Sequence, residues 1–139
     1  MKSVYPAIFT ETKDEKNTVL VEVPDLNIRT EGYGIADAIE MARDAMGLSG
    51  ITLEDLEQEI PLPSQLDEID LSLSEFQEEG KQFVSLVDID FLEYRRKLDN
   101  KSVRRNVTLP NWLNREAEKA HINVSRVLQE ALMQKMNFM

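Results

Sequence analysis

The first third of the chain shows the apolar and polar alternation of β-strands. Strands are expected at residues 4–9, 18–23 and 28–30. Pro6 favours an edge position or a chain end for the first strand, because proline lacks the N–H that a sheet ladder uses. Gly32 and Gly34 indicate a turn after the third strand.

The apolar spacing then changes to that of a helix. The stripe consists of Ile35, Ala38, Ile39, Ala42 and Met46. Gly47 is expected to close this helix, and Thr52–Asp55 has the pattern of a capping box that would begin another short helix. Residues 65–80 are acidic and irregular, which indicates a loop or linker. A further strand at 83–88 is expected to return to the sheet, followed by a helical connector at 91–98 and a joint at 99–102.

The last 37 residues, 103–139, which we call the tail, have the pattern of one short strand followed by two helices. A strand is predicted at 103–109, with Arg104, Asn106 and Thr108 on a face that has no apolar side chain. Pro110 stops the strand and favours a helix that runs to about His121. Asn123 is a good N-cap for a second amphipathic helix.

One strand and two short helices cannot close a core, because the strand has two unpaired edges and the segment is too short for independent stability. Dimerisation solves this problem: two copies pair their strands into an antiparallel ribbon, and four helices cover its apolar face. The ribbon would present Arg104, Asn106 and Thr108 twice, and it would fit the major groove of DNA. The expected dimer core consists of Val107, Leu109, Trp112, Val127, Leu128 and Leu132.

Charge divides the chain at the same place. The tail carries six Lys or Arg and three Asp or Glu residues, a net charge of +3, whereas the 102 residues before it carry ten and 23, a net charge of −13. We call residues 1–98 the body and residues 99–102 the linker. An acidic body repels nucleic acid and a basic tail attracts it, so two different partners are expected.

Several function classes are disfavoured. The chain has no cysteine, which excludes disulfides and thiolate metal sites and is compatible with a reducing cytoplasm, and no apolar run is long enough to cross a membrane. His121, the single histidine, has no second ligand for a zinc site and is expected at a helix C-terminus. The strand carboxylates Glu11, Glu22 and Asp25 form no cluster suited to a two-metal nuclease, so no catalytic residue, metal or cofactor is expected.

The tail resembles the ribbon-helix-helix family of bacterial repressors. The resemblance rests on Arg-Asn-Val-Thr-Leu-Pro at 105–110, Trp-Leu at 112–113 and Asn-Val-Ser-Arg-Val-Leu-Gln-Glu-Ala-Leu at 123–132. It implies that Arg104, Asn106 and Thr108 read bases. It also implies that the start of the second helix, at Asn123, Val124 and Ser125, holds a phosphate.

The body resembles the HicB antitoxin family. The matching stretches are Tyr-Pro-Ala-Ile-Phe at 5–9, Val-Glu-Val-Pro-Asp-Leu at 21–26, Thr-Glu-Gly at 30–32, Pro-Leu-Pro-Ser at 61–64 and Phe-Val-Ser-Leu-Val at 83–87. Asn27 and Ile28 depart from the Pro-Gly-Cys-like turn that is common in the family. The resemblance implies an α+β fold, with a small antiparallel sheet of partial ribonuclease-H-like type followed by the dimeric ribbon-helix-helix domain.

By the same resemblance, the body neutralises a HicA toxin, a small basic RNA-cleaving protein, and the tail represses the toxin–antitoxin operon in a bacterial cytoplasm. Two other interpretations stay open. The chain could be a DNA-binding regulator whose body senses a small ligand, or an acidic interaction protein whose tail only dimerises. The sequence specifies neither the operator, the RNA target, the stoichiometry nor the residues that face the toxin.

Overall fold

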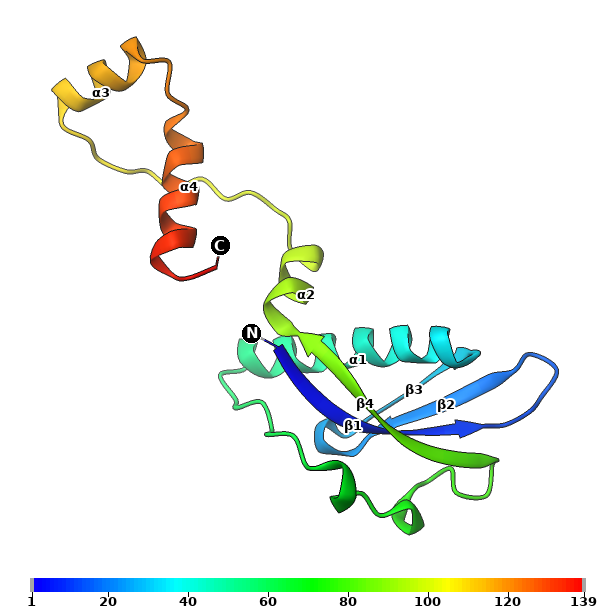
Figure 1. The fold of residues 1–139 in the computed structure, drawn as a ribbon. Helices are drawn as coiled ribbons and strands as arrows, with labels where there is room; N and C mark the ends of the chain where they lie inside the picture. The colour runs from blue at the N-terminus through cyan, green and yellow to red at the C-terminus, as the bar shows by residue number, and fades with distance from the viewer. Residues whose placement is uncertain (1, 139) are drawn as a thin grey trace. The chain divides into compact units, whose positions relative to one another are not determined.

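The computed structural model describes residues 2–138, and the chain forms two compact units, Met1–Lys101 and Ser102–Met139 (Figure 1). The first unit contains the body and the second contains the tail. Among the described residues, no helix has the length and apolar character needed to cross a membrane.

The first unit is a four-stranded sheet with one long helix. Its elements are β1 (Lys2–Glu11), β2 (Thr18–Val23), β3 (Ile28–Tyr33), α1 (Ile35–Asp55), β4 (Lys81–Asp90) and α2 (Phe91–Leu98). The strand order is β3-β2-β1-β4 and every neighbouring pair is antiparallel. This confirms the α+β class and the antiparallel sheet. The likeness to ribonuclease H stays a prediction.

The two faces of the sheet differ. The face toward α1, which we call the inner face, carries Tyr5, Ala7 and Phe9 of β1, and these pack with valines of β2 and with Ala38 and Met46 of α1. The rings of Phe9 and Phe83 stack at a centroid distance of 5.2 Å across the β1–β4 pair. The opposite face, which we call the open face, is covered in part by residues 64–80, the acidic strap.

The turn predicted at Gly32 is wrong, and the prediction for Pro6 holds only in part. β1 is an inner strand, because it pairs with both β2 and β4, but Pro6 lies in the N-terminal half of that strand. Its position is tolerated because the β1–β2 pairing ends at Ile8–Glu22, and the same register would place Pro6 opposite Pro24, which has no N–H either. Gly32 lies inside β3 rather than in a turn, and only Gly34 separates β3 from α1.

The helix predicted to close at Gly47 instead continues to Asp55 as α1, so Thr52–Asp55 is its last turn and not the start of another helix. Thr52 donates its hydroxyl to the carbonyl of Leu48 in the preceding turn. The reason for the continuation is tertiary. The rings of Tyr94 and Phe91 in α2 occupy the space that a Cβ at Gly47 or Gly50 would need, so the glycines make room for α2.

The second unit contains α3 (Asn111–Lys119) and α4 (Val124–Lys135), close to the two helices predicted from the sequence. The predicted strand at 103–109 forms no strand in the single chain: within the described residues, positions 99–110 have neither helix nor ladder. No residue from 102 to 138 is buried.

Candidate nucleic-acid and partner interfaces

The tail segment that precedes α3 carries the three candidate base-reading side chains. Arg104, Asn106 and Thr108 are all exposed. The backbone around them has no partner strand within residues 2–138, as expected of a strand whose hydrogen bonds would come from a second chain. The structure therefore leaves these side chains accessible, and their role as base readers stays a prediction.

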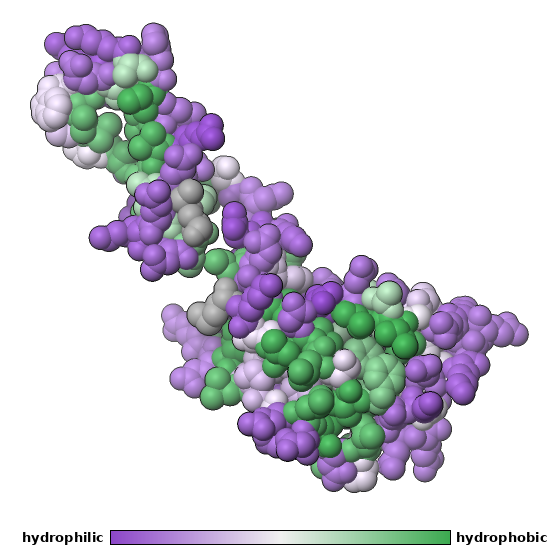
Figure 2. Space-filling model, in the orientation of Figure 1, coloured by the Kyte–Doolittle hydropathy of each residue, from purple (hydrophilic) through white to green (hydrophobic). Residues whose placement is uncertain are grey.

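The apolar side chains of the tail are largely exposed as well. Trp112 is 67% exposed, Val107 and Val127 are 51%, Leu132 is 52% and Leu109 is 37%. Leu128 is half-buried. Figure 2 shows apolar surface in the region of α3 and α4, with polar residues around it. A single tail therefore has an apolar surface with no core beneath it, which a soluble protein normally covers.

The start of α4 has the geometry predicted for a helix N-terminus. The Asn123 side chain accepts a hydrogen bond from the amide of Arg126 at 3.1 Å, which confirms Asn123 as the N-cap. The amides of Val124 and Ser125 are the first two of the helix and have no partner inside it. They are the groups that a phosphate would take, and that role stays a prediction.

His121 ends α3 rather than forming part of a reactive group. It follows the C-cap Ala120 with a positive φ of 56°. Its amide donates to the carbonyl of Glu118 and the amide of Ile122 donates to that of Ala117, which is the Schellman pattern of a helix end. The expected position at a helix C-terminus is confirmed.

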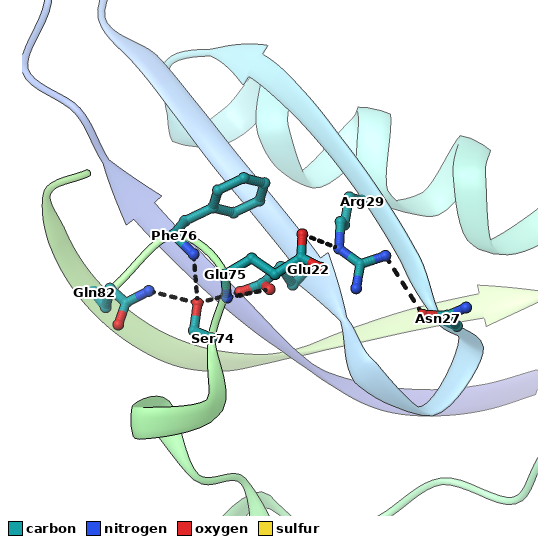
Figure 3. Close-up of polar contacts among 7 residues, drawn as sticks. All are labelled: Glu22, Asn27, Arg29, Ser74, Glu75, Phe76 and Gln82. Atoms are coloured by element: carbon teal, nitrogen blue, oxygen red, sulfur yellow. Dashed lines mark hydrogen bonds and ion pairs between the residues drawn. The ribbon is translucent and has the colours of Figure 1, made fainter. Parts of the chain in front are cut away.

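A buried carboxylate holds the acidic strap on the open face of the sheet (Figure 3). Glu22 in β2 is only 6% exposed. It accepts hydrogen bonds from the hydroxyl of Ser74 and, at 3.0 Å, from the amide of Glu75. Gln82 of β4 donates to Ser74 and to Thr10 of β1, so the strap is tied to three strands. A buried charge is stable only with such partners.

A second carboxylate holds the other end of the strap. Asp25 accepts from both the amide and the hydroxyl of Ser64, at 2.8 Å and 2.6 Å. Glu75 pairs with Arg29 of β3 at 2.7 Å. The strap has six acidic and no basic residues, so it brings much of the negative charge of the body to the open face. The sequence could not reveal this anchoring, because Glu22 and Ser74 are 52 positions apart.

Of the three carboxylates considered for catalysis, Glu22 and Asp25 line one pocket beside the acidic strap, whereas Glu11 is not part of that pocket. Glu22 and Asp25 are bonded to the strap, and Glu11 lies at the last residue of β1. Within residues 2–138, no group of three His, Asp or Glu side chains could hold a metal ion. Glu22 and Asp25 therefore both serve as hydrogen-bond acceptors for the strap.

Polar contacts also attach α2, the last element of the body, to α1. The Tyr94 hydroxyl donates to Asp44 at 2.8 Å, and burial together with this carboxylate raises the pKa of Tyr94 to about 12. Arg95 binds Asp55 at 2.9 Å and Glu54 at 3.1 Å. These contacts, with the Gly47 and Gly50 recesses, fix the point at which the chain leaves the body.

Comparison with known proteins finds similar proteins over nearly the whole chain. The family described as "HicB_like antitoxin of bacterial toxin-antitoxin system" matches residues 5–134. A chain in a toxin–antitoxin complex from Streptococcus pneumoniae is 25% identical, with a TM-score of 0.61, over 97% of this chain and 99% of that one. The Burkholderia pseudomallei antitoxin HicB is 26% identical over 97% of both chains, with a TM-score of 0.49.

No curated protein sequence matches the chain. The family match alone covers far more than half of the sequence and both compact units. The chain belongs to the HicB-like antitoxins of bacterial toxin–antitoxin systems.

Proposed function

We propose that the body binds and blocks a basic, RNA-cleaving toxin, and that the tail dimerises, binds operator DNA and represses its own operon. The observation that carries this proposal is the contrast within one chain: the acidic body has a core of its own, whereas the basic tail has none. Two units with opposite charge and opposite degrees of burial fit two partners of different chemistry.

The toxin partner is supported by charge and by the similar chain from a toxin–antitoxin complex. Opposite charge accelerates the encounter of two proteins and weakens with salt, so toxin binding is expected to slow and weaken as ionic strength rises. Residues 1–101 form a compact unit with its own buried core. Expressed without the tail, this unit should restore growth to cells that produce the toxin. A folded body that fails to do so would show that the tail takes part in neutralisation.

The DNA function is supported by the exposed polar positions of the tail. Arginine can pair with guanine and asparagine with adenine in the major groove, each pair giving ~1–3 kcal/mol of discrimination. Asn106→Ala should therefore lower operator affinity while the dimer mass is unchanged. Leu109→Ala is the matched variant from the opposite face, and it should weaken dimerisation first.

Gel shifts and light scattering separate the two effects. If Asn106→Ala, Arg104→Ala and Thr108→Ala all bind the operator like the unmodified protein, the groove-reading role is wrong and the tail is a dimerisation element only. The alternative of a ligand-sensing body has its own measurement: a small molecule from the host cell should raise the melting temperature of residues 1–101. Toxin neutralisation without any such shift favours the antitoxin function.

A further inference from the structure

The sheet of the body has two edge strands, β3 and β4, and their outward backbone groups can be assigned. The amide of Thr12 donates to the carbonyl of Thr18 at 3.1 Å, directly beyond the β1–β2 ladder. In an antiparallel sheet, the N–H and C=O of one residue point to the same neighbour, and successive residues alternate. Even-numbered residues of β1 therefore bond to β2, and odd-numbered residues bond to β4.

The register carries this alternation to both edges. Phe9 is opposite Phe83, so odd-numbered residues of β4 bond to β1, and Gln82, Val84, Leu86 and Asp88 point their N–H and C=O outward. By the same argument through β2, Arg29, Glu31 and Tyr33 point outward from β3. The carbonyl of Asp88 accepts from Arg43 at 3.3 Å, and the amide of Tyr33 donates to Asp37 at 2.7 Å, as outward groups would.

The two edges are protected differently. The β3 edge has six residues, places two charged residues at its outward positions, and has its last outward amide bonded to Asp37. The β4 edge has ten residues, and only its end at Asp88 is covered, by Arg43. Residues 82–87 contain no charge and no proline, and Leu86 is 53% exposed. Figure 2 shows apolar surface over β1 and β4. A long uncharged edge of this kind is a template for another strand.

We propose that this edge pairs with the same edge of a second copy, in antiparallel register about Ser85. Val84 of each copy would then exchange hydrogen bonds with Leu86 of the other, and Phe83 would lie opposite Val87. In this register apolar residues of Phe-Val-Ser-Leu-Val lie opposite apolar residues of the other copy, and the two-fold axis makes each such contact occur twice. The register also places Lys81 of each copy opposite Ile89 of the other, so no like charges lie directly opposite each other across this edge.

The pairing joins two bodies into one continuous sheet and goes beyond the proposed functions of toxin and operator binding. It uses no residue of the tail. A failure of this inference therefore leaves the proposed function untouched, and a failure of the proposed function leaves this pairing untouched.

A disulfide trap tests the register in the full chain. The protein has no cysteine, so Ser85→Cys introduces one thiol per copy. Residues opposite each other at a non-hydrogen-bonded position have Cα atoms ~4.5 Å apart, which a disulfide can span. We expect mild oxidation to link Ser85→Cys into a covalent dimer. Leu48→Cys, which places a thiol on the exposed side of α1, is the control and should link far more slowly.

Two further variants use the backbone directly. Val84→Pro removes an outward N–H and leaves the β1–β4 ladder intact, and Leu86→Lys places a charge on the apolar edge. Each should abolish cross-linking in the Ser85→Cys background, and each should increase hydrogen exchange at the outward amides of β4. Equal cross-linking of Ser85→Cys and Leu48→Cys would overturn the proposal. Protection of these amides that appears only after toxin is added would overturn it too, because the edge would then belong to the toxin.

Discussion

Both units of this protein carry apolar side chains, but the two units differ in how far a single chain buries them. In the body, Phe9, Val21 and Met46 are completely buried between one sheet and one helix. In the tail, α3 and α4 have amphipathic sequences but no residue between 102 and 138 is buried. The body therefore buries its apolar face within one chain, whereas the apolar face of the tail stays exposed in one chain, and we propose that a second copy covers it.

The polar groups of the two units also differ in what they bond to. Buried polar groups in the body, such as Glu22, are bonded within the chain and hold its own segments together. Polar groups on the tail, such as Arg104 and Asn106, are exposed, and their side chains have no bonded partner among the described residues. Polar residues thus stabilise the fold in one unit and are available for a partner in the other.

The largest effect is expected in the core of the body. Phe9→Ala removes a fully buried ring that stacks on Phe83, and such truncations lower the free energy of unfolding by ~3–5 kcal/mol. The loss should not depend on protein concentration, because the core belongs to one chain. Chemical denaturation at two concentrations measures both points. Leu73→Ala, at a residue 82% exposed, is the control and should change little.

The tail should respond in the opposite way to concentration. Leu132 is 52% exposed in one chain, so Leu132→Ala would cost little if the tail were monomeric. If the leucine is buried in a dimer, we expect a loss of ~2–5 kcal/mol that appears as a concentration-dependent melting of the tail. A small loss that is the same at every concentration would contradict the dimer core.

A smaller effect is expected where polar groups fasten the strap. Glu22→Ala leaves the amide of Glu75 and the hydroxyl of Ser74 without their acceptor, at a cost of ~1–3 kcal/mol. The acidic strap should then be cleaved faster by a protease, while the sheet stays folded. Glu78→Ala removes an exposed acid from the same strap and should leave cleavage unchanged. Equal cleavage of the two variants would show that Glu22 does not hold the strap.

These contrasts also explain how much the sequence could predict. Elements with strong local signals, such as the strand at 18–23, the helix at 91–98 and the Asn123 cap, occur as predicted. The helix end predicted at Gly47 is wrong because α2, which arrives 44 residues later at Phe91, needs the space beside α1. Local glycine propensity cannot report such a contact.

The candidate sites also divide into those that the local sequence predicts and those that depend on tertiary contacts. The polar face of the tail strand follows from alternation along a few residues, so the sequence alone could name Arg104, Asn106 and Thr108. The anchoring of the strap depends on Glu22 meeting Ser74 across the sheet, and the unprotected β4 edge depends on the strand order. Neither has a local signature, because both arise from which strands become neighbours.

The attachment of α2 to α1 predicts a change with pH. The pKa of Tyr94 is about 12, against 10.0 without the fold. The fold holds the neutral form of the Tyr94 side chain. The contribution of this side chain to the stability of the protein is therefore complete below pH 10 and is lost as the pH rises through 12. Burial also raises the pKa of Tyr5, so ultraviolet titration should show more than one late-ionising tyrosine, of which Tyr94→Phe removes one. Asp44→Asn should lower that pKa, because it removes the neighbouring negative charge. An unchanged titration in Asp44→Asn would contradict this assignment.

The smallest effect is expected at the turn between the tail helices. His121 has a positive φ of 56° and Asn137, after α4, has one of 60°, and both close their helices with the same pair of backbone hydrogen bonds. Glycine adopts this conformation without strain and asparagine tolerates it better than most residues. His121→Gly should therefore stabilise the tail by ~0.5–1 kcal/mol, and the matched variant Asn137→Gly by less. Thermal melting of the two proteins at one concentration decides the order. A loss of stability in His121→Gly would mean that the imidazole makes a contact in the dimer that outweighs the backbone strain, which would place the α3–α4 turn inside the interface between copies.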